Sequence, residues 1–549
     1  TDNLEDGYMG SGKRLRYSIN KYGKENHKVE ILEFFENRNE LVNREKEIVS
    51  LNEIAKDECM NIMLGGQGGF ISDEQQKKRS SAGGLSNSKK LIAVTNNGQS
   101  VQSIQLINPA TEKILDNIVV AKCWYGLKFS TDEKFLYASG GNDNWILKYG
   151  IENNKLISKD TIILGKKGYP NISPAGIEIN DALKKMYVVT KENNSLYTID
   201  LTTKKIVQVL KLEEAGYSCL LSKNKKELYI SVWGAKKVAI YDIASQKIST
   251  EINVGENPNE LLLSKNGKYL FVANAGDNSV SVISTSNKKV LEVLNAALYP
   301  NAPTGSATNG IALSENQKTL YIANADNNYL AVFDCSTPGN SISKGFIPTV
   351  WYPTNVKVIG KKIFTSNGKG FSSFSNKKGP NPTTKTQKVT YQMGEVEKNA
   401  NKTEYIGGLM KGTMSIIDEP GVMQLSRYTK TVYANTPYTK ESETTSKGEV
   451  GNPIPMIVGD ASPIKYVFYI IKENRTYDQV LGDIKEGNGD TSLVLFGEKY
   501  TPNQHKLVKE FVLLDNFYVD GEVSADGHNW TMAANANDYL EKTWPTNYG

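Results

Sequence analysis

The sequence predicts a multi-domain, mainly β protein in which a seven-bladed β-propeller is followed by part of an α/β domain and preceded by a small α/β fragment. Three observations lead to this fold class. The chain of 549 residues is too long for one hydrophobic core. A strand pattern recurs seven times in its middle. Near residue 470, an apolar run is followed at once by a cluster of polar side chains.

These observations divide the chain into five segments. We expect an α/β fragment, a linker, a propeller, a second linker with a propeller-closing hairpin, and an incomplete α/β domain, at residues 1–70, 71–88, 89–370, 371–460 and 461–549.

Composition gives little information about partners. The 65 basic and 60 acidic residues nearly balance, which favours no polyanionic partner. No apolar run reaches the roughly 18 residues of a membrane span. The cysteines are widely spaced and follow no metal-ligand or disulfide pattern, and the first residues show no signal peptide. The sequence therefore leaves the cellular compartment open.

The N-terminal fragment combines a strand-like stretch near Val29 with a helical stretch that contains Glu45, and it closes on Asn61. This order resembles the later part of GIY-YIG homing endonucleases. The resemblance implies that Glu45 binds a metal ion and that Asn61 lies near it. The paired tyrosine motifs of that family are absent from these residues, and residues 1–90 hold 15 basic and 15 acidic side chains. We therefore expect no DNA cleavage, with a DNA endonuclease remnant as the alternative interpretation.

The propeller is predicted from internal repeats. Each repeat contains an apolar residue that begins an aromatic-rich strand, followed by an Asn-rich or Ser-rich turn and two further strands. Neighbouring repeats lie 42 to 50 residues apart, a period typical of propeller blades. We call these apolar positions the register residues: Leu91, Leu136, Met186, Leu228, Leu270, Leu320 and Ile363. The pattern resembles YVTN-type propellers.

Most side chains of the repeats are expected to be structural. The Tyr or Phe after most register residues suits a half-buried strand. Asn96, Asn274 and Asn324 are expected to bond to local turns. A ligand or protein partner, if the propeller has one, is expected at the mouth of the central channel.

The segment after the repeats begins as a linker rich in Lys, Gly, Pro and Asn. Residues 405–418 then read as a hairpin that completes a blade, and helical periodicity covers 419–434.

A buried strand is predicted over 464–471, and Glu473, Asn474 and Arg475 follow it directly. Open α/β sheets place their sites at such strand ends. Oxygen ligands from Glu473 and Asn474 suit a divalent cation. Arg475 is either a phosphate clamp or a structural ion-pair partner, and Asp478 is expected to orient the turn.

A second strand is predicted over 507–515, followed by a helix that begins near Ser524. Ser524 is either a nucleophile beside a phosphate or only a helix cap. His528 lies one helical turn later and either contacts substrate or metal or is a solvated side chain. Asn529 is a candidate for holding phosphate oxygens.

The sequence Glu473-Asn474-Arg475-Thr476-Tyr477-Asp478 resembles the signature of metal-dependent phosphoesterases in the alkaline phosphatase superfamily, in the branch with phospholipase C and acid phosphatases. The resemblance implies that Ser524 is the nucleophile and that two divalent metal ions take part. It implies hydrolysis of a phosphate ester. The order of segments resembles bacterial proteins that join a YVTN-type propeller to such a domain, which implies an exported or periplasmic location.

This resemblance also implies Asp and His ligands far beyond the nucleophile. The sequence has three histidines, and Ser524 lies 25 residues before Gly549. We therefore expect about half of a catalytic site and turnover near background. The alternative is a non-catalytic propeller that binds a ligand or a protein.

Overall fold

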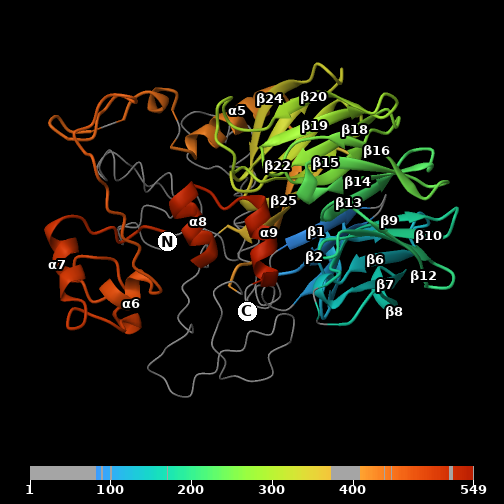
Figure 1. Cartoon of the computed structure of the whole chain (residues 1–549), viewed down its shortest axis with the longest axis horizontal. Coiled ribbons are helices and arrows are strands. Elements are labelled where there is room, and N and C mark those ends of the chain that lie inside the picture. Colours follow the sequence, from blue (N-terminus) through green and yellow to red (C-terminus); the bar gives the residue numbers. More distant parts are fainter. Residues whose placement is uncertain are drawn as a thin grey trace, which may run out of the picture. The chain divides into compact units, whose positions relative to one another are not determined.

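A computed structural model describes the parts of the chain from β1 to helix α9 (Figure 1). The described residues are 82–87, 91–98, 102–167, 169, 171–371, 409–437, 439–446, 448–518 and 524–547. The predictions for Glu45, Asn61 and the rest of residues 1–81 lie outside them. Among the described residues, no helix is long and apolar enough to span a membrane.

The strands of the described residues form seven antiparallel sheets, each built from consecutive strands. Blade 1 contains β1 (Ala82–Asn87), β2 (Ile92–Asn96), β3 (Ser103–Asn108) and β4 (Lys113–Val119). Blade 2 contains β5 (Leu127–Phe129), β6 (Phe135–Ser139), β7 (Trp145–Glu152) and β8 (Lys155–Ile163). Blade 3 contains β9 (Pro174–Asn180), β10 (Lys185–Thr190), β11 (Ser195–Asp200) and β12 (Ile206–Lys211).

The remaining blades repeat this order. Blade 4 contains β13 (Gly216–Leu221), β14 (Glu227–Val232), β15 (Lys237–Asp242) and β16 (Lys247–Asn253). Blade 5 contains β17 (Pro258–Leu263), β18 (Tyr269–Asn274), β19 (Ser279–Ser284) and β20 (Lys289–Asn295). Blade 6 contains β21 (Thr308–Leu313), β22 (Thr319–Asn324), β23 (Tyr329–Asp334) and β24 (Ile342–Pro348). Blade 7 contains β25 (Trp351–Ile359), β26 (Lys362–Gly370) and β27 (Thr413–Asp418).

The predicted seven-bladed ring is confirmed. The first strands of neighbouring blades contact one another, from β1 through to β25 and back to β1. All seven register residues are buried, and the aromatic residues that follow six of them are buried as well. The expected bonds to local turn backbone are not what the structure shows: Asn96 and Asn274 donate to the hydroxyls of Ser103 and Ser279, and Asn324 donates to the carbonyl of Ala296, 28 residues earlier. The cores lie between adjacent blades, where β-branched and aromatic side chains of facing sheets meet.

The ring closes between blades 7 and 1. Strand β27 pairs with β26 along Lys362–Asn367, so the strand expected to complete a blade does so. A closing core joins Phe364 of β26 to Ile92 and Val94 of β2 and to Ile107 of β3. Strand β1 belongs to this ring, so blade 1 begins inside the segment that we expected to be a linker (71–88).

The helices of the described residues follow the propeller along the chain, apart from two short 3-10 turns within it. The α-helices are α5 (Val422–Ala434), α6 (Tyr477–Leu481), α7 (Pro502–Glu510), α8 (Ser524–Ala533) and α9 (Asp538–Asn547). The 3-10 helices are η3 (Gly141–Asp143), η4 (Trp233–Ala235), η6 (Glu441–Glu443) and η7 (Thr491–Leu493). Helix α5 matches the helical periodicity predicted over 419–434, and its Leu425 and Val432 enter the propeller cores.

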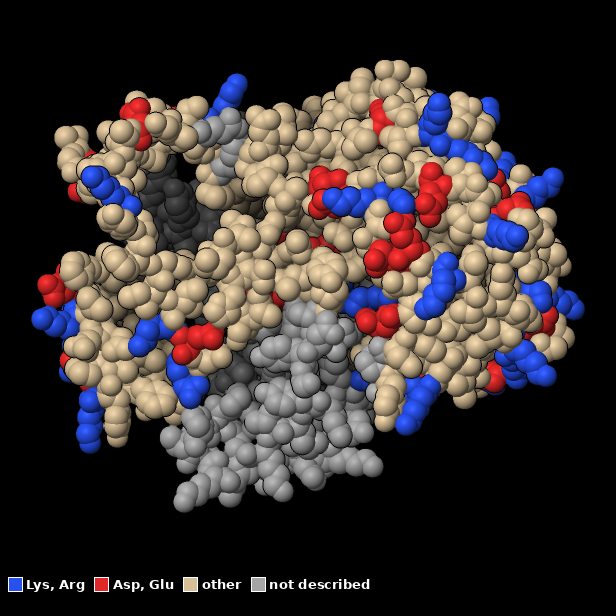
Figure 2. Space-filling model, in the orientation of Figure 1, with Lys and Arg blue, Asp and Glu red and all other residues tan. Residues whose placement is uncertain are grey.

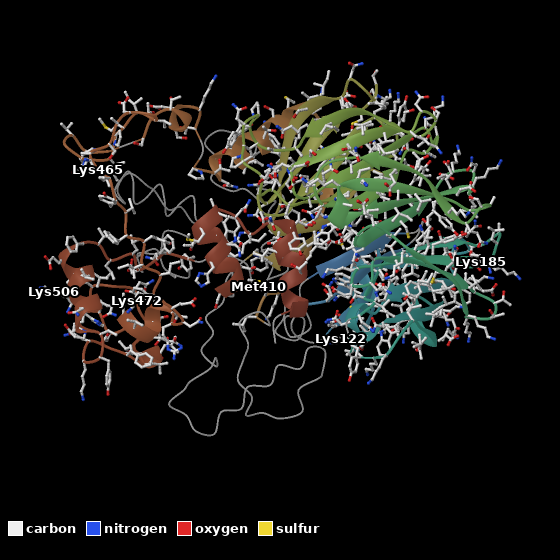
Figure 3. The ribbon with its side chains drawn as sticks, in the orientation of Figure 1. Lys122, Lys185, Met410, Lys465, Lys472 and Lys506 are labelled. Atoms are coloured by element: carbon white, nitrogen blue, oxygen red, sulfur yellow. The ribbon has the colours of Figure 1, made fainter. Side chains whose placement is uncertain are left out.

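Two predicted strands are wrong. Residues 464–471 form no strand, and Val467 and Phe468 are 83% and 91% exposed. The ribbon between Lys465 and Lys472 has no strand arrow in Figure 3. Within the described residues no strand pairs with this stretch, so its backbone has no sheet partner. Residues 502–510 form α7, because Pro502 at the first helical position favours a helix start, and 511–515 are irregular.

Candidate functional site

The turn at Glu473, Asn474 and Arg475 is positioned by the helix that follows it. Thr476 caps α6 in a capping box with Gln479, whose Oε1 accepts from the Thr476 backbone N–H at 3.3 Å. Asp478 Oδ1 accepts from the backbone N–H of Asp490 at 2.8 Å. Asp478 therefore orients the local chain, which is the role expected for it.

The structure brings together four of the predicted site residues from two segments about fifty residues apart. Ser524 Oγ donates to Asn474 Oδ1 at 3.3 Å. His528 Nε2 lies 2.9 Å from Glu473 Oε2. An ionised carboxylate can only accept, so His528 donates to Glu473 through Nε2. We call Glu473, Asn474, Ser524 and His528 the serine cluster.

The other two predicted residues have different partners. Arg475 Nη1 donates to the carbonyl of Asn474 at 2.7 Å, and its guanidinium lies 5.3 Å from the centre of the Phe496 ring. Asn529 Nδ2 donates to the carbonyl of Ala525 at 2.8 Å, one turn back on α8. Neither side chain bonds to a side chain of the serine cluster in this arrangement.

The serine cluster lies in contact with solvent. The side chains of His528 and Glu473 are 44% and 45% exposed. Exposed ion pairs contribute little stability, because water screens them and ordering the side chains costs entropy. The Glu473–His528 pair therefore does not by itself hold α8 against the turn at Asn474.

The donor chemistry of the serine cluster suits a divalent cation, but the number of ligands is small. Glu473 and Asn474 offer hard oxygen atoms, and His528 offers an imidazole. In the described residues, no group of three or more His, Cys, Asp or Glu side chains is arranged to hold a metal ion. The cluster thus fits part of a metal site. The candidate metal ligand Glu45 lies outside the described residues.

A second histidine contact, missed by sequence reasoning, is structural. His505 on α7 is buried, with Nε2 2.8 Å from Asp483 Oδ1 and Nδ1 2.9 Å from the carbonyl of Thr501. Burial would raise the pKa of Asp483, but the hydrogen bonds from His505 and from the backbone of Glu498 outweigh it and lower that pKa. This contact fixes α7 against the loop before it.

Sequence reasoning also missed the contact between α9 and the propeller (Figure 1). Trp233 Nε1 donates to the Asp538 carboxylate at 2.7 Å, and the Tyr539 ring stacks on Trp233 with centroids 5.3 Å apart. Lys542 Nζ donates to Asn309 Oδ1 at 3.0 Å. These partners lie more than 200 residues apart in sequence, so no local pattern signals them.

Burial of titratable groups marks the same region. Burial is the main reason that the pKa values of Tyr217 and Tyr352 lie well above their usual range. Tyr352 donates its hydroxyl to Glu541 of α9. Burial, reinforced by the negative charge of Asp326, also raises the pKa of Glu541 well above its usual value.

The surface charge shows no extended patch of one sign on the visible face, where Lys and Arg alternate with Asp and Glu (Figure 2). Cys123, Cys219 and Cys335 are buried free thiols. Burial raises the pKa of Cys123 to about 12 and that of Cys335 to about 11. Thiols with such pKa values are unreactive near neutral pH.

Known proteins resemble two parts of the chain. Residues 77–338 match the family model described as "YNCE-like beta-propeller". The N-terminal region is similar to endonucleases of Enterobacteria phage T4. Putative endonuclease segB is 46% identical over 70 residues, which are 13% of this chain and 32% of the phage protein. Putative endonuclease segC is 43% identical over 70 residues, 13% of this chain and 35% of the phage protein. The chain spans about a third of the length of these curated relatives.

Two solved structures align with about half of the chain. Hydrazine synthase of Kuenenia stuttgartiensis aligns with a TM-score of 0.45 and 19% identity, over 55% of this chain and 96% of that chain. The RRP9 WD40 repeats align with a TM-score of 0.45 and 14% identity, over 53% of this chain and 88% of that chain.

Proposed function

We propose that the C-terminal segment carries the nucleophile side of a metal-dependent phosphoesterase site, attached to the β-propeller. The observation that carries this proposal is the convergence of Ser524 and His528 with Glu473 and Asn474 across about fifty residues.

Each residue of the serine cluster has a role in this proposal. The Ser524 hydroxyl would lose its proton and bond to phosphorus as the ester oxygen leaves and takes up a proton to become the alcohol. Water would then cleave the phosphoserine, restoring the hydroxyl and releasing phosphate. Ser524 begins α8, where free backbone N–H groups and the helix dipole favour an anion. Asn474 Oδ1 accepts a hydrogen bond from the Ser524 hydroxyl and so orients that hydroxyl. His528, which contacts Glu473, lies one helical turn after Ser524 and would contact the substrate.

The metal would be bound by Glu473 and Asn474. A bound divalent cation supplies charge stabilisation to the phosphate oxygens. Arg475 and Asn529 would reach those oxygens only after leaving their present partners, the carbonyls of Asn474 and Ala525. Because the described residues supply few metal ligands, we expect slow turnover. Metal binding and formation of the phosphoserine are therefore more sensitive tests than the steady-state rate.

Calorimetric titration with Mn²⁺ tests the metal assignment. We expect Glu473→Gln to weaken binding at least tenfold. Glu498→Gln is the matched control, because Glu498 is an exposed carboxylate paired with Lys509 on α7. If Glu473→Gln binds Mn²⁺ as the unsubstituted chain does, Glu473 is not a metal ligand.

Incubation with p-nitrophenyl phosphate and Mn²⁺, followed by mass spectrometry of the acid-quenched protein, tests the nucleophile. We expect phosphate on the peptide that contains Ser524, and its loss in Ser524→Ala. Labelling at another residue, or nitrophenol release that is unchanged in Ser524→Ala, contradicts the assignment.

A non-catalytic binding function of the propeller is the second candidate. The observation that favours it is the set of polar and aromatic contacts between the propeller and α9, which has the form of a receptor holding a helical peptide.

A further inference from the structure

The side chains that hold α9 come from four of the seven blades. Lys191 follows β10 in blade 3, and Tyr217 and Trp233 belong to blade 4. Asn309 lies on β21 in blade 6, and Tyr352 lies on β25 in blade 7. We call these five residues the helix-binding surface. Its composition of aromatic rings with a few hydrogen-bonding groups is typical of recognition surfaces.

One turn of α9 supplies a carboxylate and an ammonium group to this surface. The buried Asp538 carboxylate accepts from Trp233 and forms an ion pair with Lys542 four residues later. Lys542 Nζ lies 4.6 Å from the centre of the Tyr217 ring, a cation–π contact. Lys191 Nζ donates to the carbonyl of Lys542 at 2.9 Å.

Among residues 538–543, the part of α9 whose side chains the structure describes, none belongs to the hydrophobic cores of the propeller. The core clusters of the described residues include Leu425 and Val432 of α5 but no residue of α9. Helix α5 is thus part of the propeller fold, whereas α9 is held by hydrogen bonds, an ion pair and stacked rings. Buried charges of this kind add little stability compared with apolar packing, but they can discriminate strongly between partners.

We propose that the helix-binding surface is a peptide-binding site, and that α9 is its ligand within this chain. The ligand class is a short helix with four defined positions. It carries a carboxylate at position i, an aromatic ring at i+1, a second carboxylate at i+3 and a lysine at i+4, as in Asp538, Tyr539, Glu541 and Lys542. This inference does not depend on phosphoesterase chemistry.

The binding of α9 to the propeller also affects the serine cluster, because α9 follows α8 closely in the chain. Only residues 534–537 separate α9 from α8, and Asn535 Nδ2 donates to the carbonyl of Thr304 in the propeller at 3.0 Å. Bound α9 therefore restrains the helix that carries Ser524 and His528. The weak exposed pair between Glu473 and His528 is supported by this anchor.

A peptide supplied in trans tests the proposal on the full chain. The double variant Asp538→Ala, Lys542→Ala frees the surface, and a fluorescent peptide of residues 535–547 is the probe. We expect saturable anisotropy binding to the double variant. Binding to the unsubstituted chain is expected to be at least tenfold weaker, because tethered α9 competes at an effective concentration on the order of millimolar.

Three controls make the experiment specific. A probe that carries Asp538→Ala and Lys542→Ala is expected not to bind. Adding Trp233→Phe to the double variant retains a stacking ring but removes the donor to Asp538, so binding of the original probe is expected to fall at least threefold. Tyr169→Ala removes an aromatic ring that is exposed on the propeller, and is expected to leave binding unchanged.

The proposal is overturned if the probe binds none of the chains while hydrogen exchange shows their propeller strands to be intact. It is also overturned if Trp233→Phe and the altered probe bind as tightly as the originals. Faster hydrogen exchange in residues 538–547 of the double variant, with unchanged exchange in β13 and β14, is the result expected from release of α9 alone.

Discussion

The register residues carry the packing of the propeller. Six of the seven have no exposed surface, and Leu91 is 8% exposed. Six lie in the strand next to the innermost one of their blade, and Leu91 directly precedes that strand in blade 1; these side chains belong to the cores between facing sheets. Interiors are close-packed, so a cavity at such a position is costly.

Leu270→Ala is therefore expected to destabilise the propeller by about 2–5 kcal/mol, the range for buried Leu to Ala changes. The matched control is Val293→Ala in the same blade, where the side chain is 60% exposed. Surface changes of that kind are usually within about 0.5 kcal/mol. Urea unfolding followed by tryptophan fluorescence measures both, and equal midpoints for the two variants would contradict the role of Leu270.

The residues of the candidate site were predictable by type and position, but their contacts were not. The sequence singled out Glu473, Asn474, Ser524 and His528, which the structure brings together. It also singled out Arg475 and Asn529, which bond to carbonyls next to them or one turn away. A local pattern indicates which residue types suit a phosphate, whereas the hydrogen bond that a long side chain selects depends on the nearest available acceptor.

At the scale of elements, repeated strands were predictable and isolated ones were not. Seven copies of one pattern support one another, and alternation within each strand sets its register. The apolar run at 464–471 has no such support, since a strand forms only where another strand satisfies its backbone groups. Pro502 is a signal for the start of a helix, whereas the apolar residues of 507–515 resemble a strand, and the helix is what forms.

We expect the binding of helix α9 to the propeller to depend on pH. Glu541 is buried beside Tyr352, Asp326, Lys369 and Asp538, and burial followed by the charge of Asp326 raises its pKa well above the usual 4.5. Bound α9 thus holds a proton that free α9 releases above about pH 4.5. By linkage, binding is strongest below that pH and weakens as the pH rises toward the raised pKa.

Hydrogen exchange of residues 538–547, corrected for intrinsic rates, is expected to show progressively weaker protection of α9 from pH 5 to pH 8. Glu541→Gln keeps the oxygen that accepts from Tyr352 and removes the titration, so its protection is expected to be nearly independent of pH. Glu498→Gln, on an exposed carboxylate, is expected to keep the slope of the unsubstituted chain. Protection that increases with pH would show that another group controls binding.

The N-terminal element is similar in sequence to phage endonucleases, yet we expect it to cut no DNA. Residues 1–90 carry 15 basic and 15 acidic side chains, whereas binding to the phosphate backbone requires a basic surface. A plasmid-nicking assay with Mg²⁺ measures this. Cleavage that disappears in Glu45→Ala would overturn the expectation and would assign a metal-binding role to Glu45.

At the scale of the molecule, one pair of neighbouring blades in the ring is not consecutive in sequence. Blades 1 to 7 follow one another in sequence, and only blades 7 and 1 meet across the ends of the repeat array. Phe364, Ile92, Val94 and Ile107 form the core there. This closing core is the sole apolar cluster of the described residues that joins blade 7 to blade 1.

Phe364→Ala is expected to cost about 3–5 kcal/mol, and so is Phe271→Ala in the core between blades 5 and 6, since both rings are buried. The two variants are expected to differ in which strands lose protection from hydrogen exchange. Loss of Phe364 lets blades 1 and 7 separate while the other interfaces remain, so exchange should increase first in β2, β3 and β26. Loss of Phe271 leaves its blade linked to both neighbours by the chain, so exchange should increase only with unfolding of the whole ring. Identical exchange patterns in the two variants would mean that all interfaces open together, and that closure between blades 7 and 1 has no separate role in the stability of the propeller.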